Sequence, residues 1–147
     1  MPRRRLPAIV LAVAAAAACG RTESTAQRVT RIRRGYRVES AAAPARRTAA
    51  DGMLRVDLLV VDTGRERLER LTLLVHVVGR DGRERLARRS ALDVSALVPG
   101  VPAPLSLVVP GVGVAPGESA FVELEEAPPA EALGDFPEYA NARGSAR

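Results

Sequence analysis

Residues 54–60 and residues 71–78 each carry an apolar side chain at every second position. The apolar members are Leu54, Val56, Leu58, Val60, Leu71, Leu73, Val75 and Val77. A period of two residues places such side chains on one face of an extended strand. Residues 19–147 show no helical period, so the sequence predicts an all-β fold without helices.

Turn sequences separate these two segments from further predicted strands. The polar segment 62–67 follows the first strand, and Asp81-Gly82 is typical of a tight hairpin whose two central residues both have positive φ. Weaker strands are predicted near residues 86–93, 105–109 and 120–124, and the Pro-Gly pairs at 99–100 and 110–111 fit type II turns. Strands at this spacing predict a small antiparallel β-sandwich over residues 52–126.

The order of the turns gives a more specific resemblance. Asp62-Thr63-Gly64 follows an apolar strand, Asp81-Gly82 follows a long strand, and residues 114–119 precede the last strand. Over residues 54–126 this pattern resembles the small immunoglobulin-like domains of bacterial envelope proteins, including the type named for its FxLYD motif. The chain lacks a Phe-Xaa-Leu-Tyr-Asp stretch and has residues 75–79 where the aromatic residue is expected. The resemblance implies an immunoglobulin-like β-sandwich that serves as a non-catalytic interaction or spacer module.

The first 20 residues resemble the signal peptide of a bacterial lipoprotein. Three arginines at 3–5 precede the apolar run Leu6–Ala18, and small alanines lead directly to Cys19, the only cysteine of the chain. The resemblance implies that residues 1–18 are removed by cleavage between Ala18 and Cys19, which becomes a lipid-modified N-terminus. It therefore implies a membrane-anchored envelope protein. If the cell is Gram-negative, the resemblance favours the outer membrane, because Gly20 rather than aspartate follows the cysteine.

Two other interpretations of this segment stay open. The first is an ordinary secretory signal that is cut within the alanine run, which would leave Cys19 as a stray thiol or remove it. An unpaired thiol is a liability in an oxidising compartment, and this favours the lipoprotein. The second is a membrane-spanning anchor, but its 13 apolar residues are fewer than the roughly 20 that a spanning helix needs.

The charge of the chain gives no reason to expect a nucleic-acid partner. Residues 1–18 contain three arginines and no acidic residue, so their removal lowers the formal net charge from +5 to +2. A charge this small on the remaining chain is weak evidence for nucleic-acid binding. The aromatic residues that stacking on bases would require number only four.

The segments on either side of the sandwich are expected to be a tether and a tail. Residues 19–51 are polar and rich in arginine and alanine, which predicts a flexible tether in which only Tyr36–Ser40 could form an edge strand. Five of the eight arginines of the tether form a basic cluster that either contacts anionic lipid or is simply solvated: Arg28, Arg31, Arg33, Arg34 and Arg37. Residues 127–147 are rich in proline and alanine, so we expect an irregular tail rather than a further strand. Its aromatics, Phe136 and Tyr139, either dock on a partner or fold back onto the sandwich.

The sequence offers little for catalysis or metal binding. It has one histidine and no cluster of ligands, so we expect no catalytic residue, no metal and no cofactor. His76 shares a strand face with Leu74 and Val78, and we interpret it as a packed or edge histidine. An enzyme would need His76 to lie beside two carboxylates.

These observations lead to one functional hypothesis and one alternative. The first is a lipid-anchored envelope protein whose sandwich is an interaction or structural module, with a partner bound by strand addition at a free sheet edge. The alternative is a ligand-binding accessory subunit of a secretion or transport complex, which a convincing apolar pocket would favour.

Overall fold

The computed structural model describes residues 22–40, 43–44, 46–48 and 52–140. The expected signal peptide, with the cleavage residue Ala18 and the lipid-attachment residue Cys19, lies outside the described residues. In chain order the elements are α1 (Thr25–Arg33), β1 (Tyr36–Ser40), β2 (Ala43–Pro44), β3 (Arg46–Thr48), β4 (Met53–Asp62), β5 (Arg70–Val78), β6 (Glu84–Asp93), β7 (Ala103–Val109), β8 (Ser119–Glu123) and the 3-10 helix η1 (Ala130–Asp135). No helix in these ranges is long and apolar enough to cross a membrane.

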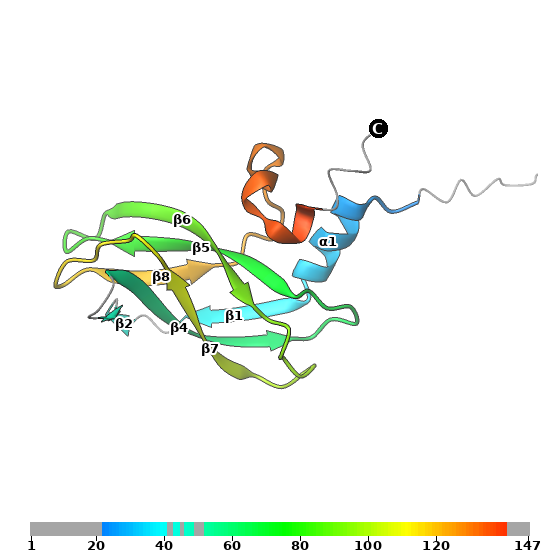
Figure 1. The fold of residues 1–147 in the computed structure, drawn as a ribbon, viewed down its shortest axis with the longest axis horizontal. Coiled ribbons are helices and arrows are strands. Elements are labelled where there is room, and N and C mark those ends of the chain that lie inside the picture. Colours follow the sequence, from blue (N-terminus) through cyan, green and yellow to red (C-terminus); the bar gives the residue numbers. More distant parts are fainter. Residues whose placement is uncertain (1–21, 41–42, 45, 49–51, 141–147) are drawn as a thin grey trace, which may run out of the picture.

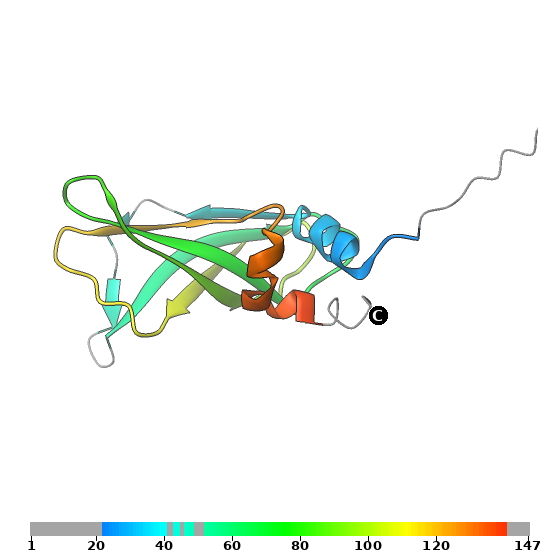
Figure 2. The same cartoon turned by 90° about the horizontal axis from the view of Figure 1, so that it is seen from above.

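The strands form two antiparallel sheets that face each other (Figures 1 and 2). In sheet A, β4 pairs with β1 and β3 along one side and with β7 along the other. Sheet B has the order β2-β8-β5-β6. The chain changes sheets between β4 and β5, β6 and β7, and β7 and β8, and the short strands β1, β2 and β3 also alternate between the two sheets. The predicted all-β sandwich is confirmed, and so is Tyr36–Ser40 as an edge strand.

The period-two alternation builds the core between the two sheets. Every apolar residue that defined the alternation is buried: Leu54, Val56, Leu58, Val60, Leu71, Leu73, Val75 and Val77. They pack against alternate residues of the other strands, chiefly Leu92, Leu107, Val109, Ala120 and Val122. Burial of large aliphatic side chains contributes roughly 1.5–3 kcal/mol for each one, so this layer is the main source of stability of the sandwich.

The hairpin between β5 and β6 differs from the predicted geometry. Only Gly82 has a positive φ, of 75°, and Asp81 does not. The Gly82 amide donates to the Gly79 carbonyl at 3.0 Å, and the Gly79 amide donates to the Arg83 carbonyl at 2.9 Å. Residues 79–82 therefore form a four-residue turn that ends on the left-handed Gly82. Asp81 does not adopt the left-handed conformation that the predicted two-residue hairpin would require of it.

The absence of helices from residues 19–147 was a wrong prediction, because α1 lies in the expected tether. Ser24 caps the helix with a reciprocal capping box: its side chain accepts from the Gln27 amide, and the Gln27 side chain accepts from the Ser24 amide. The helix buries only Val29, Ile32 and the side chain of Arg33. An apolar stripe of two residues is too narrow to stand out as a helical period in the sequence.

The end of the chain folds back onto α1. Phe136 and Tyr139 are each 1% exposed, and they form a second small cluster with Val29 and Ala132. The Thr30 and Tyr139 hydroxyls share a hydrogen bond of 2.8 Å. Of the two readings of the tail aromatics, the structure shows the one in which they fold back: they pack with Val29 of α1, and Phe136 also contacts Arg89 of the edge strand β6. The C-terminal segment lies beside α1 in Figure 1.

Candidate functional site

Strands β6 and β7 are the two longest strands that leave one side without a backbone partner among the described residues; the shorter β1, β2 and β3 also pair on one side only. Strand β6 ends sheet B and pairs only with β5, while β7 ends sheet A and pairs only with β4. An unpaired strand edge offers a row of amide and carbonyl groups to an added strand. These two edges are the structural candidates for the strand addition that the sequence suggested.

The β6 edge is guarded by its own side chains. The pairing with β5 shifts between Val77 and Val78, so Arg85 is the extra residue of a β-bulge. The bulge directs Arg85 to the loop 110–118, where it donates to the Gly113 carbonyl at 2.6 Å. Three residues further on, Arg88 donates to the Pro110 carbonyl at 3.0 Å. A bulge and arginines that reach across an edge are recognised ways of discouraging further strand pairing.

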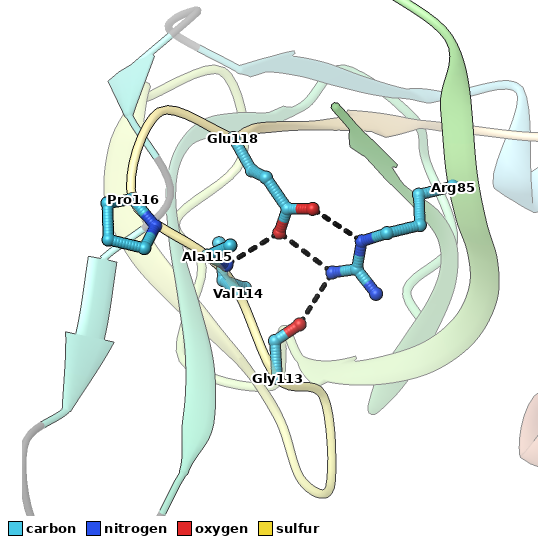
Figure 3. Close-up of a pocket in the computed structure, with 6 residues that line it drawn as sticks. All are labelled: Arg85, Gly113, Val114, Ala115, Pro116 and Glu118. Atoms are coloured by element: carbon cyan, nitrogen blue, oxygen red, sulfur yellow. Dashed lines mark hydrogen bonds and ion pairs between the residues drawn. The ribbon is translucent and has the colours of Figure 1, made fainter. Parts of the chain in front are cut away.

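Figure 3 shows the depression that Arg85 and this loop enclose. Both oxygens of Glu118 bind Arg85, at 2.6 and 2.9 Å, and one of them also accepts the Ala115 amide at 2.7 Å. The depression has a volume of about 500 Å³ and is open to solvent. Because its charged groups satisfy one another, we interpret it as a clasp that holds the loop to β6 rather than as a ligand site.

The clasp predicts a pH dependence of stability. Hydrogen bonds from Arg85, and then from the Ala115 amide, lower the pKa of Glu118 below its ordinary value of 4.5. A lowered pKa in the folded state means that the contribution to stability is complete above about pH 4.5 and is lost as the pH falls through the lowered pKa. We expect Glu118→Gln to flatten the fall of the free energy of unfolding below about pH 4.5, measured by urea titration.

A matched substitution controls for the general effect of removing a carboxylate. Glu126 is exposed, so Glu126→Gln should leave the acid limb of the stability profile unchanged. The interpretation of the clasp fails if Glu118→Gln and Glu126→Gln give the same profile.

The β7 edge is open and is flanked by an apolar surface. On the outer face of sheet A, Pro104 lies opposite Leu59, and Val108 lies opposite Arg55. Leu59 is 43% exposed and Val108 is 38% exposed. Between these two rows, the Ser106 hydroxyl donates to Asp57 at 2.7 Å. We call Leu59, Pro104, Ser106 and Val108 the β7 surface.

A strand added at β7 would place alternate side chains against this surface. Cross-strand neighbours on one face of a sheet are the contacts that select a partner, while main-chain hydrogen bonds supply affinity. The sequence of β4 could have indicated this surface in advance. On this face of β4 the polar residues Arg55 and Asp57 are followed by the apolar residues Leu59 and Val61.

His76 lies where the enzyme interpretation would need it, between two carboxylates. On the outer face of sheet B, its Nδ1 contacts Glu84 of β6 and its Nε2 lies 3.1 Å from Glu123 of β8. Phe121 stacks on the ring, with centroids 4.5 Å apart and planes 9° apart. Each ring nitrogen thus faces a carboxylate and one ring face is covered. His76 joins three strands and presents no free nitrogen to a substrate.

The arginines of the expected tether separate in the fold. Arg28 and Arg31 form surface ion pairs with Glu66, and Arg31 also pairs with Glu23. Arg33 is completely buried. Only Arg34 and Arg37 of the five form no ion pair with a described residue. The five arginines therefore do not form one continuous basic surface.

Ligand sites and similar proteins add no further assignment. No group of three or more His, Cys, Asp or Glu residues in the described part of the chain could hold a metal ion. The other depressions along the described ranges are open and lined largely by charged residues, including Arg67, Glu69, Arg70 and Glu138 in one of them. Comparisons with known protein families, known proteins and solved structures find no match to this chain.

Proposed function

We propose that this chain is a lipid-anchored protein of the bacterial cell envelope and that its β-sandwich is a non-catalytic interaction module. Cys19 carries the lipid after cleavage behind Ala18, and the sandwich binds an extended segment of another envelope protein by strand addition. The observation that supports the interaction most directly is the open β7 edge beside an exposed apolar surface. The guarded β6 edge supports β7 as the one that is used.

The anchor is tested by metabolic labelling with a fatty-acid analogue. We expect the label to be incorporated into the wild-type chain and to be lost from Cys19→Ala, because the thiol is the attachment point. The wild-type chain should sediment with membranes, and Cys19→Ser should behave as Cys19→Ala does. An unlabelled wild-type chain that fractionates as a soluble protein would show instead that residues 1–18 are an ordinary secretory signal.

The interaction is tested by photo-crosslinking in the host. We expect a photoreactive amino acid at Ser106 to capture a discrete partner and one at Ala87, an exposed residue of β6 on the opposite sheet, to capture none. Val108→Asp should abolish capture from Ser106, since it puts a charge into the apolar surface. Exposed substitutions typically change stability by less than about 0.5 kcal/mol, so the fold should survive. Equal capture from both sites would rule out the β7 edge as the docking site.

A further inference from the structure

The loops around α1 carry the most exposed apolar residues of the described chain. Val98 and Val101 are 59% and 51% exposed, and they lie on either side of the turn formed by Pro99 and Gly100. The Val101 amide donates to the Val98 carbonyl at 3.1 Å, and Gly100 has φ 73°. This is the predicted type II turn, and its geometry holds both valines at the surface.

Hydrogen bonds place this turn at the same end of the sandwich as α1 (Figure 1). The Gly100 amide donates to the Asp62 carbonyl at 2.7 Å, at the end of β4. The next residue of the chain, Thr63, donates its amide to the Gly35 carbonyl at 2.8 Å, directly after α1. The loop 94–102, the loop 63–69 and the end of α1 therefore form one surface.

Four exposed arginines lie on the elements that form this end of the sandwich: Arg34 directly after α1, Arg37 in β1, and Arg65 and Arg67 in the loop 63–69. Arg34, Arg37 and Arg65 are exposed, and none forms an ion pair with a described residue. Arg67 is also exposed, and its guanidinium reaches the Leu97 carbonyl at 3.5 Å, next to Val98. Of the acids on these elements, Glu23 and Glu66 are bound by Arg28 and Arg31, the Asp62 side chain is buried, and Glu69 is exposed, so the arginines outnumber the accessible acids. We call Val98, Val101, Arg34, Arg37, Arg65 and Arg67 the α1-end surface.

The number of residues between Cys19 and α1 limits how far this surface can lie from a membrane that holds the lipid of Cys19. Only five residues separate Cys19 from Thr25, the first residue of α1. A chain spans at most about 3.5 Å per residue, so the start of α1 stays within roughly 20 Å of Cys19. The nine residues of α1 are about 13 Å long. This reach allows the helix to lie along a membrane and the loops beside it to touch the surface.

We propose that the α1-end surface docks on anionic phospholipid headgroups, with Val98 and Val101 inserted among them and the arginines at headgroup level. The proposal rests on the lipid anchor of the proposed function. Each arginine near an anionic membrane contributes about 1 kcal/mol of attraction, and exposed apolar residues gain by leaving water for the interface. The opposite end of the sandwich, with the β5–β6 hairpin, then points away from the membrane.

The single cysteine of the chain makes a direct test possible. Acylation consumes the thiol of Cys19, so Val98→Cys introduces the only reactive thiol of the lipidated protein. Arg83→Cys is the matched control, because the Arg83 side chain is 89% exposed at the tip of the distant β5–β6 hairpin. The lipidated variants are placed in vesicles of phosphatidylcholine and phosphatidylglycerol, or in detergent, and treated with a membrane-impermeant maleimide.

We expect the thiol at 98 to react about tenfold more slowly in the vesicles than in detergent, a factor equivalent to roughly 1.4 kcal/mol of association. The thiol at 83 should react equally fast in both. Protection at 98 should weaken in vesicles of phosphatidylcholine alone, and undiminished protection there would overturn the role of the arginines. If the thiol at 98 reacts as fast in protein that floats with the anionic vesicles as it does in detergent, the docking itself is overturned.

The remaining outcomes identify other occupants or a failed anchor. Protection at 98 that develops in detergent as protein concentration rises would replace the membrane with a second copy of the chain. Protection in host membranes but not in vesicles would replace it with a protein partner. A chain that does not float and reacts at two thiols is not acylated, and this result alone refutes the proposed function rather than only the docking.

Discussion

Replacing Glu138 with glutamine is expected to lower the free energy of unfolding by about 3–5 kcal/mol, because it leaves the charge of Arg33 buried without its counter-ion. The side chains of Arg33 and Glu138 are 0% and 2% exposed and form an ion pair. Arg33 also donates to the carbonyls of Thr72, at 3.1 Å, and Glu125, at 2.8 Å. Glu138 in turn accepts the Thr72 amide at 2.8 Å and the Thr72 hydroxyl at 2.6 Å.

Two further variants separate the charge from the hydrogen bonds. Glu23→Gln breaks an ion pair whose Arg31 and Glu23 side chains are 53% and 41% exposed, and we expect a much smaller loss of stability than from Glu138→Gln. Adding Arg33→Met to Glu138→Gln removes the uncompensated charge, while the glutamine still accepts the Thr72 amide. Urea unfolding should show that much of the stability returns. If the double variant is no more stable than Glu138→Gln, the hydrogen bonds and not the charge pair hold the tail.

Removing the aromatic ring of Phe136 is expected to cost about 3–5 kcal/mol, as is usual for a buried phenylalanine replaced by alanine. The ring is 1% exposed and contacts three side chains. It lies 5.0 Å from the guanidinium of Arg33 and 5.4 Å from that of Arg89, and it packs edge to face on Tyr139 at 5.9 Å. Phe136→Ala therefore leaves a cavity and also removes two cation–π contacts.

The other phenylalanine of the chain is a control for this substitution. Phe121 is 40% exposed, on the outer face of sheet B, so Phe121→Ala creates no cavity and should cost less than about 1 kcal/mol. Thermal or urea unfolding of the two variants gives the comparison directly. Equal losses from the two would mean that the tail is not part of the cooperative fold.

Together these contacts join the two segments that flank the sandwich in the sequence. Arg33 comes from the end of α1, Glu138 and Phe136 come from the C-terminal segment, and Thr72 lies in β5. Although Thr72 is on the outer side of β5, it is 0% exposed, because α1 and the C-terminal segment cover that part of sheet B. The segments expected to be a tether and a tail thus add a partial third layer, and α1 is the part of this layer that follows Cys19 most closely in the sequence.

The sequence by itself determined the sandwich. The strands at 53–62 and 70–78 follow from apolar residues at every second position, because only an extended chain directs such residues to one face. The Pro-Gly pair at 99–100 determined its turn for a similarly local reason, since proline fixes one φ and glycine permits the next to be positive. Both features could be predicted because the interactions that cause them involve residues that are neighbours along the chain.

Tertiary structure alone decided what the flanking segments do. The apolar residues of α1, Val29 and Ile32, are too few to predict a helix. Val29 is buried against Phe136 and Tyr139, more than 100 residues away, and Ile32 joins the core between the sheets. In the sequence Arg33 cannot be told apart from the neighbouring solvated arginines, but in the fold it is bound by Glu138 and by two backbone carbonyls. The grouping of Val98 with Arg34 and Arg65 likewise exists only in three dimensions. The fold brings these distant residues together, and no periodicity or spacing within the flanking segments predicts such contacts.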